Sequence, residues 1–402
     1  MRVLQLSTHS TLLPRYGGQL RSHHIGRCLE NASFEVSRIA VCWPNGHDLQ
    51  DTREPIIDLS VSPFWRSETY LEAKPWGSYL FDYYSAIAVA ETPTLMNELR
   101  EHIALAAPDV ILLEHPWTWP LVKTLADFGT DTVRVVYSSH NVETLLKRRM
   151  IEDARLKVPS DVLDGVAALE HDLVTSAWAT VACTPADAEI FRSWGADRVV
   201  VANNGAAFKS RDNLVSALPA PLDVQHRFGL FIGSNYLPNI NGFFRYIAPA
   251  LWRLRPHQRI VIAGTVCEPI NVEIAFSPLR HYQDGRLISL GFVDDMTLNA
   301  LIANAAALLL PIEYGGGSHL KTAEALASGR PIVGTGASFR GFAEYQDLPR
   351  VTIADTPEEF EAALQELLST PAADSGDFTL PREVLWESTL DPLVELIRSC
   401  SN

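Results

Sequence analysis

Residues 311–335 read Pro-Ile-Glu-Tyr-Gly-Gly-Gly-Ser-His-Leu-Lys-Thr-Ala-Glu-Ala-Leu-Ala-Ser-Gly-Arg-Pro-Ile-Val-Gly-Thr, and they follow the wholly apolar segment Ala307–Leu310. The apolar segment predicts a buried strand, and the three glycines predict a turn. A helix is expected from near Ser318 to Gly329, with the next strand at Pro331–Val333. A strand, a glycine turn, a helix and another strand in this order are typical of a parallel sheet covered by helices.

The same pattern recurs in both halves of the chain. The first half opens with a strand at Arg2–Leu6, a turn at Pro14–Gly18 and a helix at Gln19–Glu30. Its later strands are expected at Glu35–Val41, Val110–Leu113, Val133–Ser138, Thr180–Ala182 and Val199–Val201, and its later helices at Leu121–Asp127 and Val162–Ser176. The second half has expected strands at Gly229–Ile232, Arg259–Ala263, Leu287–Leu290, Ala307–Leu310 and Pro331–Val333, with a helix at Asn239–Leu254. Short apolar strands that alternate with amphipathic helices predict two parallel sheets, each covered on both faces.

The fold class predicted from this pattern is α/β, with two Rossmann-like, doubly wound domains facing an interdomain cleft. We expect an N-terminal domain at residues 1–205, a linker at 206–227 and a C-terminal domain at 228–380. Residues 381–402 should form a terminal helix, Arg382–Ser399, that could pack back on the first domain. The segment Asp51–Ser85 is rich in Trp, Tyr and Pro, and we expect it to be an insertion over the mouth of the first sheet rather than a layer of it.

Composition and charge disfavour several classes of function. The 402 residues include 33 Lys and Arg against 48 Asp and Glu, a net charge of −15, which argues against nucleic acid or an anionic membrane as the main partner. The five cysteines are widely spaced, as in a protein with reduced thiols. No apolar run reaches the roughly 18 residues of a membrane span, and the N-terminus lacks a signal-peptide pattern. We therefore expect a cytoplasmic protein, which could still associate transiently with a membrane.

The glycine turn and the helix after it carry the strongest chemical signal. Glycines allow backbone N–H groups to approach an anion, and the start of a helix favours negative charge. Lys321 lies within reach of such an anion, and it is one of only six lysines in the chain. Glu324 follows on the same helix face, where a carboxylate can accept hydrogen bonds from two ribose hydroxyls. The plainer alternative is a tight turn followed by a solvent-exposed Lys–Glu pair.

Several other kinds of site lack their sequence signature. The chain contains no His-Glu-x-x-His, Cys-x-x-Cys or Asp-x-Asp, so we expect no metal site. No Gly-x-Gly-x-x-Gly follows a strand, and no Gly-x-Ser-x-Gly occurs. We therefore expect no dinucleotide cofactor and no serine nucleophile.

The features above resemble the glycosyltransferases of the two-Rossmann-domain (GT-B) type, in particular the large retaining group called family 4 or group 1. The segment Gly315–Val333 is similar to the donor-binding helix of that family. Other segments agree with the family in order and spacing: Leu113–Trp117, Tyr137–Glu143, Val201–Gly205, Phe231–Asn239, Ile262–Thr265 and Leu290–Asp294. The resemblance therefore covers nearly the whole chain.

The resemblance implies that a nucleotide-sugar donor binds the C-terminal domain and that no further cofactor is needed. Its base is expected near Thr265 and Val293, its ribose on Glu324, and its pyrophosphate at the start of the helix. The expected donor-binding residues are Gly17, Gly18, Gly233, Thr265, Val293, Gly315, Gly316, Gly317, Ser318, Lys321, Thr322 and Glu324.

The sequence departs from the family pattern in two places. The family has two glutamates eight residues apart, and the first of them falls on Gly316; Glu313 cannot be assumed to replace it. The family's Arg and Lys after the first donor-domain strand are also missing, because those places read Ser234, Asn235 and Asn241. We expect Lys321, together with Arg340, to supply the missing positive charge.

In the N-terminal domain the resemblance implies a functional histidine at His115, which follows a predicted strand. The expected catalytic residues are His115, Lys321 and Glu324, and the expected acceptor-binding residues are Glu114, Trp117, His140 and Glu143. Trp117 would stack on a sugar face. Arg21 could add charge near the donor phosphate, whereas His23 and His24 are expected to have no special role.

The function implied by the resemblance is transfer of a sugar from a nucleotide-activated donor to a glycan, a lipid-linked glycan or another glycoconjugate, with retention, without metal and without a protein general base. One alternative is a protein of this fold that binds a nucleotide sugar or glycan without turnover. Another is a sugar-nucleotide epimerase that uses Glu114 and Glu143 as its carboxylates, and a third is a two-domain dehydrogenase. The sequence names neither the base, the sugar, the acceptor, the linkage nor the oligomeric state.

Overall fold

The computed structural model describes residues 1–12, 14, 16–44, 53–124, 133–207, 218–222, 225–280, 285–314, 316–370 and 379–401. The chain divides into two compact units: Met1–Asn203 with Thr389–Asn402, and Asn204–Ser388. The predicted linker at 206–227 falls within the second unit, and part of it lies outside the described residues.

The first unit contains a sheet of seven parallel strands in the order β3-β2-β1-β4-β5-β6-β7. Its strands are β1 (Arg2–Ser7), β2 (Glu35–Cys42), β3 (Ile56–Asp58), β4 (Val110–Leu113), β5 (Arg134–Ser138), β6 (Ala179–Ala182) and β7 (Val199–Val201). The central strands are short and buried on both faces; every residue of β4 is buried. This is the order of a doubly wound sheet. Strands β2 and β3 are added on one side of β1, and strands from β4 onward are added on its other side.

The prediction for Asp51–Ser85 is wrong in one respect. Part of this segment, β3, is a layer of the sheet: Ile56 pairs with Ala40 and Asp58 with Cys42 of β2, in parallel register. The sequence hides this three-residue strand because the Trp, Tyr and Pro residues that follow it dominate the composition of the segment. The aromatic side chains that follow it form a packed cluster with α3 and α7.

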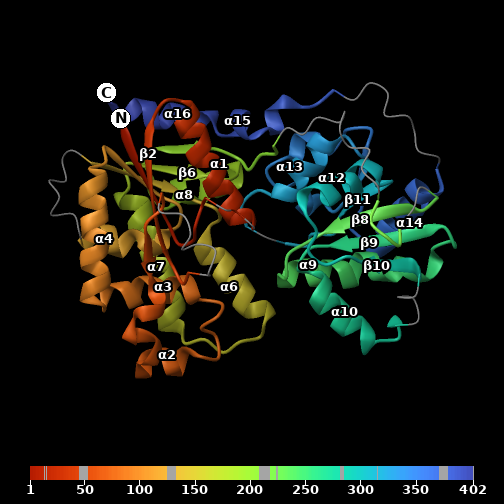
Figure 1. The fold of residues 1–402 in the computed structure, drawn as a ribbon, viewed down its shortest axis with the longest axis horizontal. Helices are drawn as coiled ribbons and strands as arrows, with labels where there is room; N and C mark the ends of the chain where they lie inside the picture. The colour runs from red at the N-terminus through yellow and green to blue at the C-terminus, as the bar shows by residue number, and fades with distance from the viewer. Residues whose placement is uncertain are drawn as a thin grey trace. The chain divides into compact units, whose positions relative to one another are not determined.

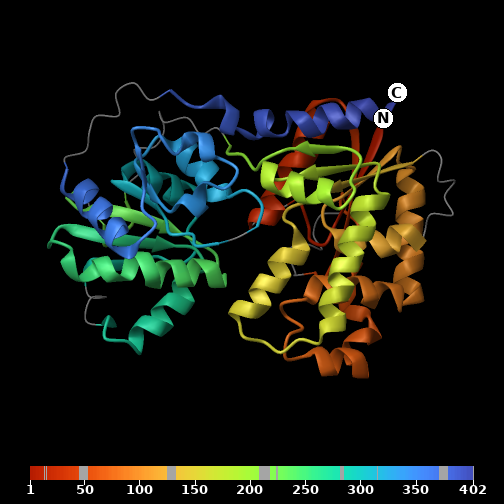
Figure 2. The ribbon, with the colours of Figure 1, turned by 180° about the vertical axis from the view of Figure 1, so that it is seen from behind.

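Helices lie on both faces of the first sheet (Figures 1 and 2). They are α1 (Gly17–Asn31), α2 (Glu68–Ala73), α3 (Phe81–Ala90), α4 (Pro93–Ala106), α5 (Trp119–Thr124), α6 (Glu143–Asp153), α7 (Ser160–Ser176), α8 (Pro185–Ser193) and α16 (Asp391–Arg398). The largest core cluster of this unit joins Leu4 and Leu6 of β1 to Leu99 of α4 and Leu173 of α7.

The second unit contains six parallel strands in the order β10-β9-β8-β11-β12-β13. They are β8 (Arg227–Ile232), β9 (Gln258–Ala263), β10 (Leu287–Ser289), β11 (Ala307–Leu310), β12 (Ile332–Gly334) and β13 (Val351–Ile353). The edge strand β13 is a further element that the sequence pattern does not reveal. Here the strand order reverses between β8 and β11. Both units are therefore doubly wound, and the predicted α/β fold class is confirmed.

The helices of the second unit are α9 (Leu237–Gly242), α10 (Cys267–Ala275), α12 (Asp295–Asn304), α13 (Leu320–Ser328) and α14 (Pro357–Ser369). The single helix predicted at Asn239–Leu254 is divided: α9 is followed by a π-helical turn, Phe243–Ile247, and a 3-10 segment, Ala248–Arg253. Pro249 explains the break, because its ring lacks an N–H and clashes with the preceding turn.

The C-terminal segment is also divided where one helix was expected. A 3-10 turn, Arg382–Val384, precedes α15 (Trp386–Thr389) and α16, which has a proline in its first turn. α16 packs against β7 of the first unit and buries Leu393 and Ile397.

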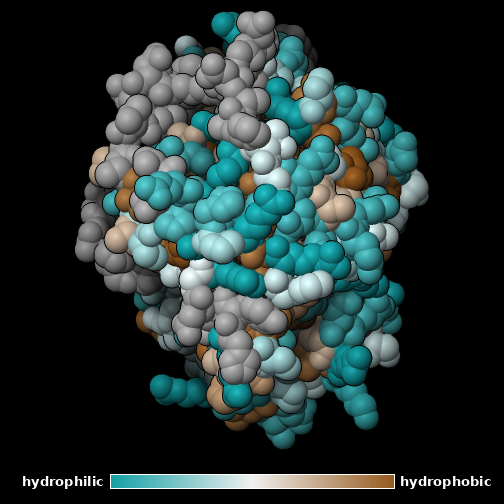
Figure 3. All heavy atoms as spheres, turned by 90° about the vertical axis from the view of Figure 1, so that its right-hand side faces the viewer, coloured by the Kyte–Doolittle hydropathy of each residue, from teal (hydrophilic) through white to brown (hydrophobic). Residues whose placement is uncertain are grey.

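Figure 3 shows a face of the second unit on which hydrophilic side chains predominate and hydrophobic ones are scattered. Among the described residues, no helix is long and apolar enough to span a membrane.

Candidate functional site

Three backbone turns pack against one another at the carboxyl edge of the second sheet. The N–H of Gly233 donates to the carbonyl of Ala263 (2.9 Å), and the N–H of Gly264 donates to the carbonyl of Gly291 (2.7 Å). Gly264 has a φ of +98°, and a Cβ there would lie 2.2 Å from the carbonyl oxygen of Gly233. Glycine is therefore required for the turns after β8 and β9 to approach so closely.

The residues expected to contact the base lie on these turns. Thr265 is exposed, and its Oγ1 accepts a hydrogen bond from the N–H of Asn235 (2.8 Å). Val293 is half-buried on the turn after β10. Both stand at the carboxyl edge, as predicted, and their contact with a base stays a prediction.

The helix after the glycine turn begins two residues later than expected. α13 starts at Leu320, so Ser318 belongs to the turn, where its Oγ accepts from the N–H of Asn204 (2.8 Å). The side-chain amide of Asn204 also donates to the carbonyl of Ser318 (2.7 Å). Gly317, with a φ of +61°, allows the bend at this point.

Three further residues of the predicted donor site belong to the glycine turn or to α13. Gly316 is half-buried, and Gly315 lies outside the described residues. Thr322 is buried, and its Oγ1 donates to the carbonyl of Ser338 (2.5 Å). Thr322 thus anchors α13 to the segment after β12. Its hydroxyl hydrogen is already used in this bond and is not available to a bound nucleotide sugar.

Among the predicted site residues of the second unit, Lys321 has the best-defined surroundings. Its Nζ donates to Asn239 Oδ1 (2.6 Å) and lies 5.5 Å from the centre of the Phe231 ring. The amide nitrogen of Asn239 donates in turn to the carbonyl of Ser234 (2.9 Å), on the turn after β8. Burial lowers the pKa of Lys321 to about 8, although the charge of Glu324 acts in the opposite direction.

Two further basic side chains lie near Lys321. Burial lowers the pKa of His319 to about 4, and the charges of Lys321 and Arg340 lower it further. The charges of Lys321 and Arg340 thus both reach His319, the residue before α13. Glu324 is exposed one turn further along the helix. Glu313, which the sequence left as a doubtful substitute for the missing glutamate, pairs with Arg245 instead.

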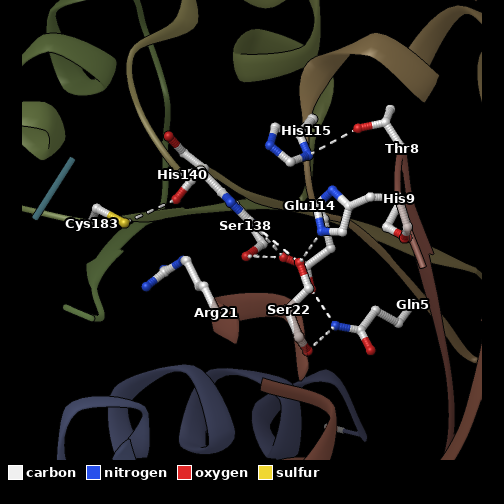
Figure 4. A network of polar contacts seen from close by, with 12 residues as sticks. Gln5, Thr8, His9, Arg21, Ser22, Glu114, His115, Ser138, His140 and Cys183 are labelled. Atoms are coloured by element: carbon white, nitrogen blue, oxygen red, sulfur yellow. Dashed lines mark hydrogen bonds and ion pairs between the residues drawn. The ribbon is translucent and has the colours of Figure 1, made fainter. Parts of the chain in front are cut away.

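Glu114 is the centre of a polar network at the carboxyl edge of the first sheet, where the neighbouring strands β1 and β4 end (Figure 4). It is fully buried, and its carboxylate accepts hydrogen bonds from Gln5 Nε2 (2.5 Å) and Ser138 Oγ (3.2 Å). His140 Nε2 lies 2.9 Å from Glu114 Oε2. Burial raises the pKa of Glu114, and the hydrogen bond from Gln5 opposes this rise.

Three imidazoles gather above Glu114. The ring centres of His115 and His140 lie 4.1 Å apart, and that of His9 lies 5.4 Å from His115. Burial lowers the pKa of each histidine, most strongly for His115 and His140, so those two rings are neutral at pH 7. The structure therefore brings together His115 and His140, which the sequence singled out separately.

Gly18 lies beside this histidine cluster. A Cβ at Gly18 would stand 3.5 Å from His140 Nδ1 and 3.8 Å from His9 Cε1. Gly17 is the first residue of α1, one position earlier. Both glycines stand at the carboxyl edge, as the sequence predicted, and their contact with a donor stays a prediction.

Two sequence predictions in the first unit are wrong. Trp117 is only 1% exposed; its ring packs in the core cluster below the edge, with Lys147 Nζ 5.5 Å from the ring centre, and cannot stack on a sugar. Arg21 is also buried, and its Nη2 donates to the carbonyl of Ala202 (2.9 Å). Its charge therefore acts on the buried Glu114 rather than on a phosphate.

Glu143 is buried at the start of α6. It accepts a hydrogen bond from Asn141 Nδ2 (3.0 Å), and burial raises its pKa to about 7. The neighbouring Glu170 accepts from the N–H groups of Glu143 (2.9 Å) and Thr144 (2.7 Å), which satisfies the first turn of α6.

Sequence reasoning missed four members of the first-unit site: Gln5, His9, Asp82 and Lys147. His9 follows β1 just as His115 and His140 follow β4 and β5, so its place after a strand was a usable signal. Asp82 and Lys147 form an ion pair (3.2 Å) between α3 and α6, and no local pattern announces a pair 65 residues apart. Among the described residues, no group of three or more His, Cys, Asp or Glu side chains is arranged to hold a metal ion.

Comparisons with known proteins identify the family of each part of the chain. Residues 17–205 match the family described as glycosyl transferase 4-like domain, and residues 227–370 match glycosyl transferases group 1. Together the two matches span most of the chain. No curated protein sequence matches it.

Solved structures with the same fold cover the chain from end to end. The sucrose-phosphate synthase of Thermosynechococcus elongatus has a TM-score of 0.67 at 15% identity, covering 100% of this chain and 95% of that chain. HepE of Anabaena in complex with UDP-glucose has a TM-score of 0.62 at 14% identity, covering 99% and 100%. The lipopolysaccharide outer core galactosyltransferase WaaB has a TM-score of 0.57 at 12% identity, covering 100% and 99%. At these sequence identities the similarity to solved structures establishes the fold alone. The family matches establish that the chain belongs to the group 1 glycosyltransferases, with a glycosyl transferase 4-like domain before the group 1 domain.

Proposed function

We propose that the protein transfers a sugar from a nucleoside-diphosphate sugar to a hydroxyl of a glycan or lipid-linked glycan, with retention and without a metal ion or further cofactor. The second unit holds the donor, and the first unit holds the acceptor. The observation that carries the proposal is the position of Lys321. Asn239 of α9 holds its ammonium group near the start of α13, where we expect a diphosphate to bind.

The basic groups at the start of α13 support a diphosphate rather than a neutral ligand. Lys321 and Arg340 both lie close enough to His319 for their charges to lower its pKa, and bound phosphate oxygens would pair with these two cations. These groups also compensate for the Arg and Lys that are missing after β8. Glu324, exposed one turn later, is placed to accept from the ribose hydroxyls.

The same groups would stabilise the leaving group during transfer. Negative charge develops on the β-phosphate as the glycosidic bond breaks, and pre-oriented cations and helix N–H groups stabilise it with little reorganisation. In the retaining mechanism that we propose, the acceptor hydroxyl attacks from the face that the phosphate leaves, and the phosphate takes the hydroxyl proton. The neutral His115 contacts the transferred sugar as a hydrogen-bonding group rather than as a general base.

The donor site is tested by two variants, Lys321→Ala and Glu324→Ala. A ligand that binds only the folded protein raises its unfolding midpoint, by about 2.7 kcal/mol of stabilisation at a hundredfold excess over Kd. We expect one of UDP, GDP, ADP, CMP and dTDP to shift the wild-type midpoint and both variants to lose most of that shift. If both variants bind the same nucleotide as tightly as wild type, the donor site has been assigned to the wrong residues.

A second candidate is a protein that binds a nucleotide sugar without turning it over. Gly316 stands where the family has its first glutamate, and the carboxylate of Glu313 is engaged by Arg245. Release of nucleoside diphosphate from the donor that shifts the midpoint most, with and without acceptor glycans, separates the two candidates. The epimerase alternative is disfavoured because its two carboxylates, Glu114 and Glu143, are both buried in hydrogen-bonded networks.

A further inference from the structure

An exposed tryptophan stands at the carboxyl edge of the first sheet. Trp43 follows β2 directly, and half of its surface is exposed (51%). Its ring centre lies 5.7 Å from that of Trp65 and 6.5 Å from that of Phe81. Trp65 and Phe81 are themselves stacked, with ring centres 5.1 Å apart and planes 9° from parallel. The inner rings therefore support Trp43 from below and leave the rest of its surface open to solvent.

The residue after Phe81 supplies a carboxylate on the same edge. Asp82 is in the first turn of α3, and its side chain is 41% exposed. Its Oδ2 accepts from Lys147 Nζ (3.2 Å), and in the described part of the chain no hydrogen bond reaches its Oδ1. Partial burial acts to raise the pKa of Asp82, but the charge of Lys147 and its hydrogen bond outweigh it and hold the pKa below its ordinary value. The carboxylate is thus ionised at pH 7 and can accept further hydrogen bonds.

Asp82 lies beside the histidine cluster. Asp82 is near enough to His115 and His9 for their charges to act on each other. Lys147, from the second turn of α6, is buried and fixes the carboxylate by an ion pair between two helices. The helix turn that contains Phe81 and Asp82 therefore contacts the Trp43 ring through Phe81 and lies near the histidine cluster through Asp82.

We propose that Trp43 and Asp82 form a saccharide subsite, in which a sugar ring of the acceptor lies on the Trp43 indole and its hydroxyls donate hydrogen bonds to Asp82. Aromatic faces attract the C–H surfaces of sugars, and a carboxylate accepts from vicinal hydroxyls. Lys147 acts as a positioning residue for Asp82. This subsite takes over the stacking role that the buried Trp117 cannot perform. The inference rests on the proposed function, because it specifies the acceptor side of the same reaction.

A saccharide fits this surface better than a phospholipid headgroup does. Asp82 is anionic and partly exposed, and the chain carries a net charge of −15, so an anionic bilayer would be repelled. A polyhydroxylated ring meets no such repulsion.

The test is binding of fluorescently labelled protein to a printed array of oligosaccharides. We expect wild type to retain one class of glycan and Trp43→Ala to bind that class at least about tenfold more weakly. Trp43→Phe, which keeps an aromatic face, should retain most of the binding, and Asp82→Asn should weaken it. Trp252→Ala is the matched control, because Trp252 is equally exposed (52%) in the second unit, and it should bind as wild type does.

Three outcomes would overturn the subsite. They are binding by Trp43→Ala equal to wild type, no glycan retained by wild type, and Trp43-dependent binding to phosphatidylglycerol vesicles in place of glycans. Calorimetric titration of each variant with the nucleoside diphosphate distinguishes this failure from that of the proposed function. Trp43→Ala should keep the nucleotide affinity of wild type. A wild type that binds no nucleotide would instead refute the donor site and leave the glycan result standing by itself.

Discussion

Lys321 can be identified from the sequence as a candidate site residue, whereas its hydrogen-bond partner and its burial cannot. The glycine turn and the scarcity of lysines mark it, and the resemblance to a donor-binding helix assigns its role. Its partner Asn239 lies 82 residues away, on a helix of another strand–helix unit. Only the packed sheet reveals that this amide holds the ammonium group and that burial lowers its pKa to about 8.

The affinity for nucleoside diphosphate should therefore fall as the pH rises through about 8. Bound phosphate favours the charged ammonium, so binding above the pKa of the free protein must also take up a proton, at a cost of up to about tenfold in Kd per pH unit. Calorimetric titration at about pH 7 and about pH 9 measures the difference. Lys321→Met should bind weakly at both values and show little pH dependence between them. A wild-type Kd that is the same at both values would contradict a phosphate contact by Lys321.

Residue orientation is the part of the site that the sequence could not supply. Strand ends place Glu114, His115 and His140 on one edge, and the structure brings all three together. Trp117 lies only two residues beyond His115, yet it points into the core. Both directions are compatible with the same local pattern, because long-range packing against α3 and α7 decides between them.

At the scale of elements, the sequence is most informative where burial is complete. Strands such as β4 and β11 are predicted to the residue, because a wholly apolar run of four in a parallel sheet has few alternatives. Of the four three-residue edge strands, β7 and β10 are predicted and β3 and β13 are not; the missed strands read Ile-Ile-Asp and Val-Thr-Ile. The interrupted helix after β8 could have been anticipated from Pro249, whose missing N–H breaks the hydrogen-bond ladder.

Gly242, the last residue of α9, is predicted to be essential for packing that helix on the end of β11. A Cβ there would lie 1.8 Å from the carbonyl oxygen of Pro311, a backbone atom that cannot move without displacing the glycine turn. We expect Gly242→Ala to lower the free energy of unfolding by about 3 kcal/mol or more, measured by urea denaturation.

Gly18→Ala provides the matched control for this effect. Its added methyl group would meet His140 at an ordinary contact distance of 3.5 Å, and alanine favours the helical backbone. Its free energy of unfolding should stay within about 1 kcal/mol of wild type. Equal losses in the two variants would show that α9 does not pack as described.

At the scale of the whole molecule, the chain leaves the first unit after Asn203 and returns to it at Thr389. Ala206, near the start of the second unit, pairs with Leu385 near its end, through hydrogen bonds from Ala206 N to Val384 O (2.8 Å) and from Trp386 N to Ala206 O (3.2 Å). The second unit is thus closed on itself and has its own core.

Residues 204–388 should accordingly fold when expressed alone and should retain most of the nucleotide affinity, because Lys321, Glu324 and the packed turns all belong to this segment. We expect a Kd within about tenfold of the full chain, measured by calorimetry, with Lys321→Ala in the same segment as the control. A folded segment that binds no nucleotide would show that Gly17 and Gly18 of the first unit supply the main contacts.

The pairing of Ala206 with Leu385 also has a meaning at the level of the gene. The second unit is encoded by one contiguous stretch of the gene, and the residues near its two ends are hydrogen-bonded neighbours. Such a stretch can be exchanged between homologous genes without creating a new loop to be closed. Under the proposed function, the choice of the donor sugar and the choice of the acceptor would then be inherited separately, and recombination would yield new glycans from existing parts.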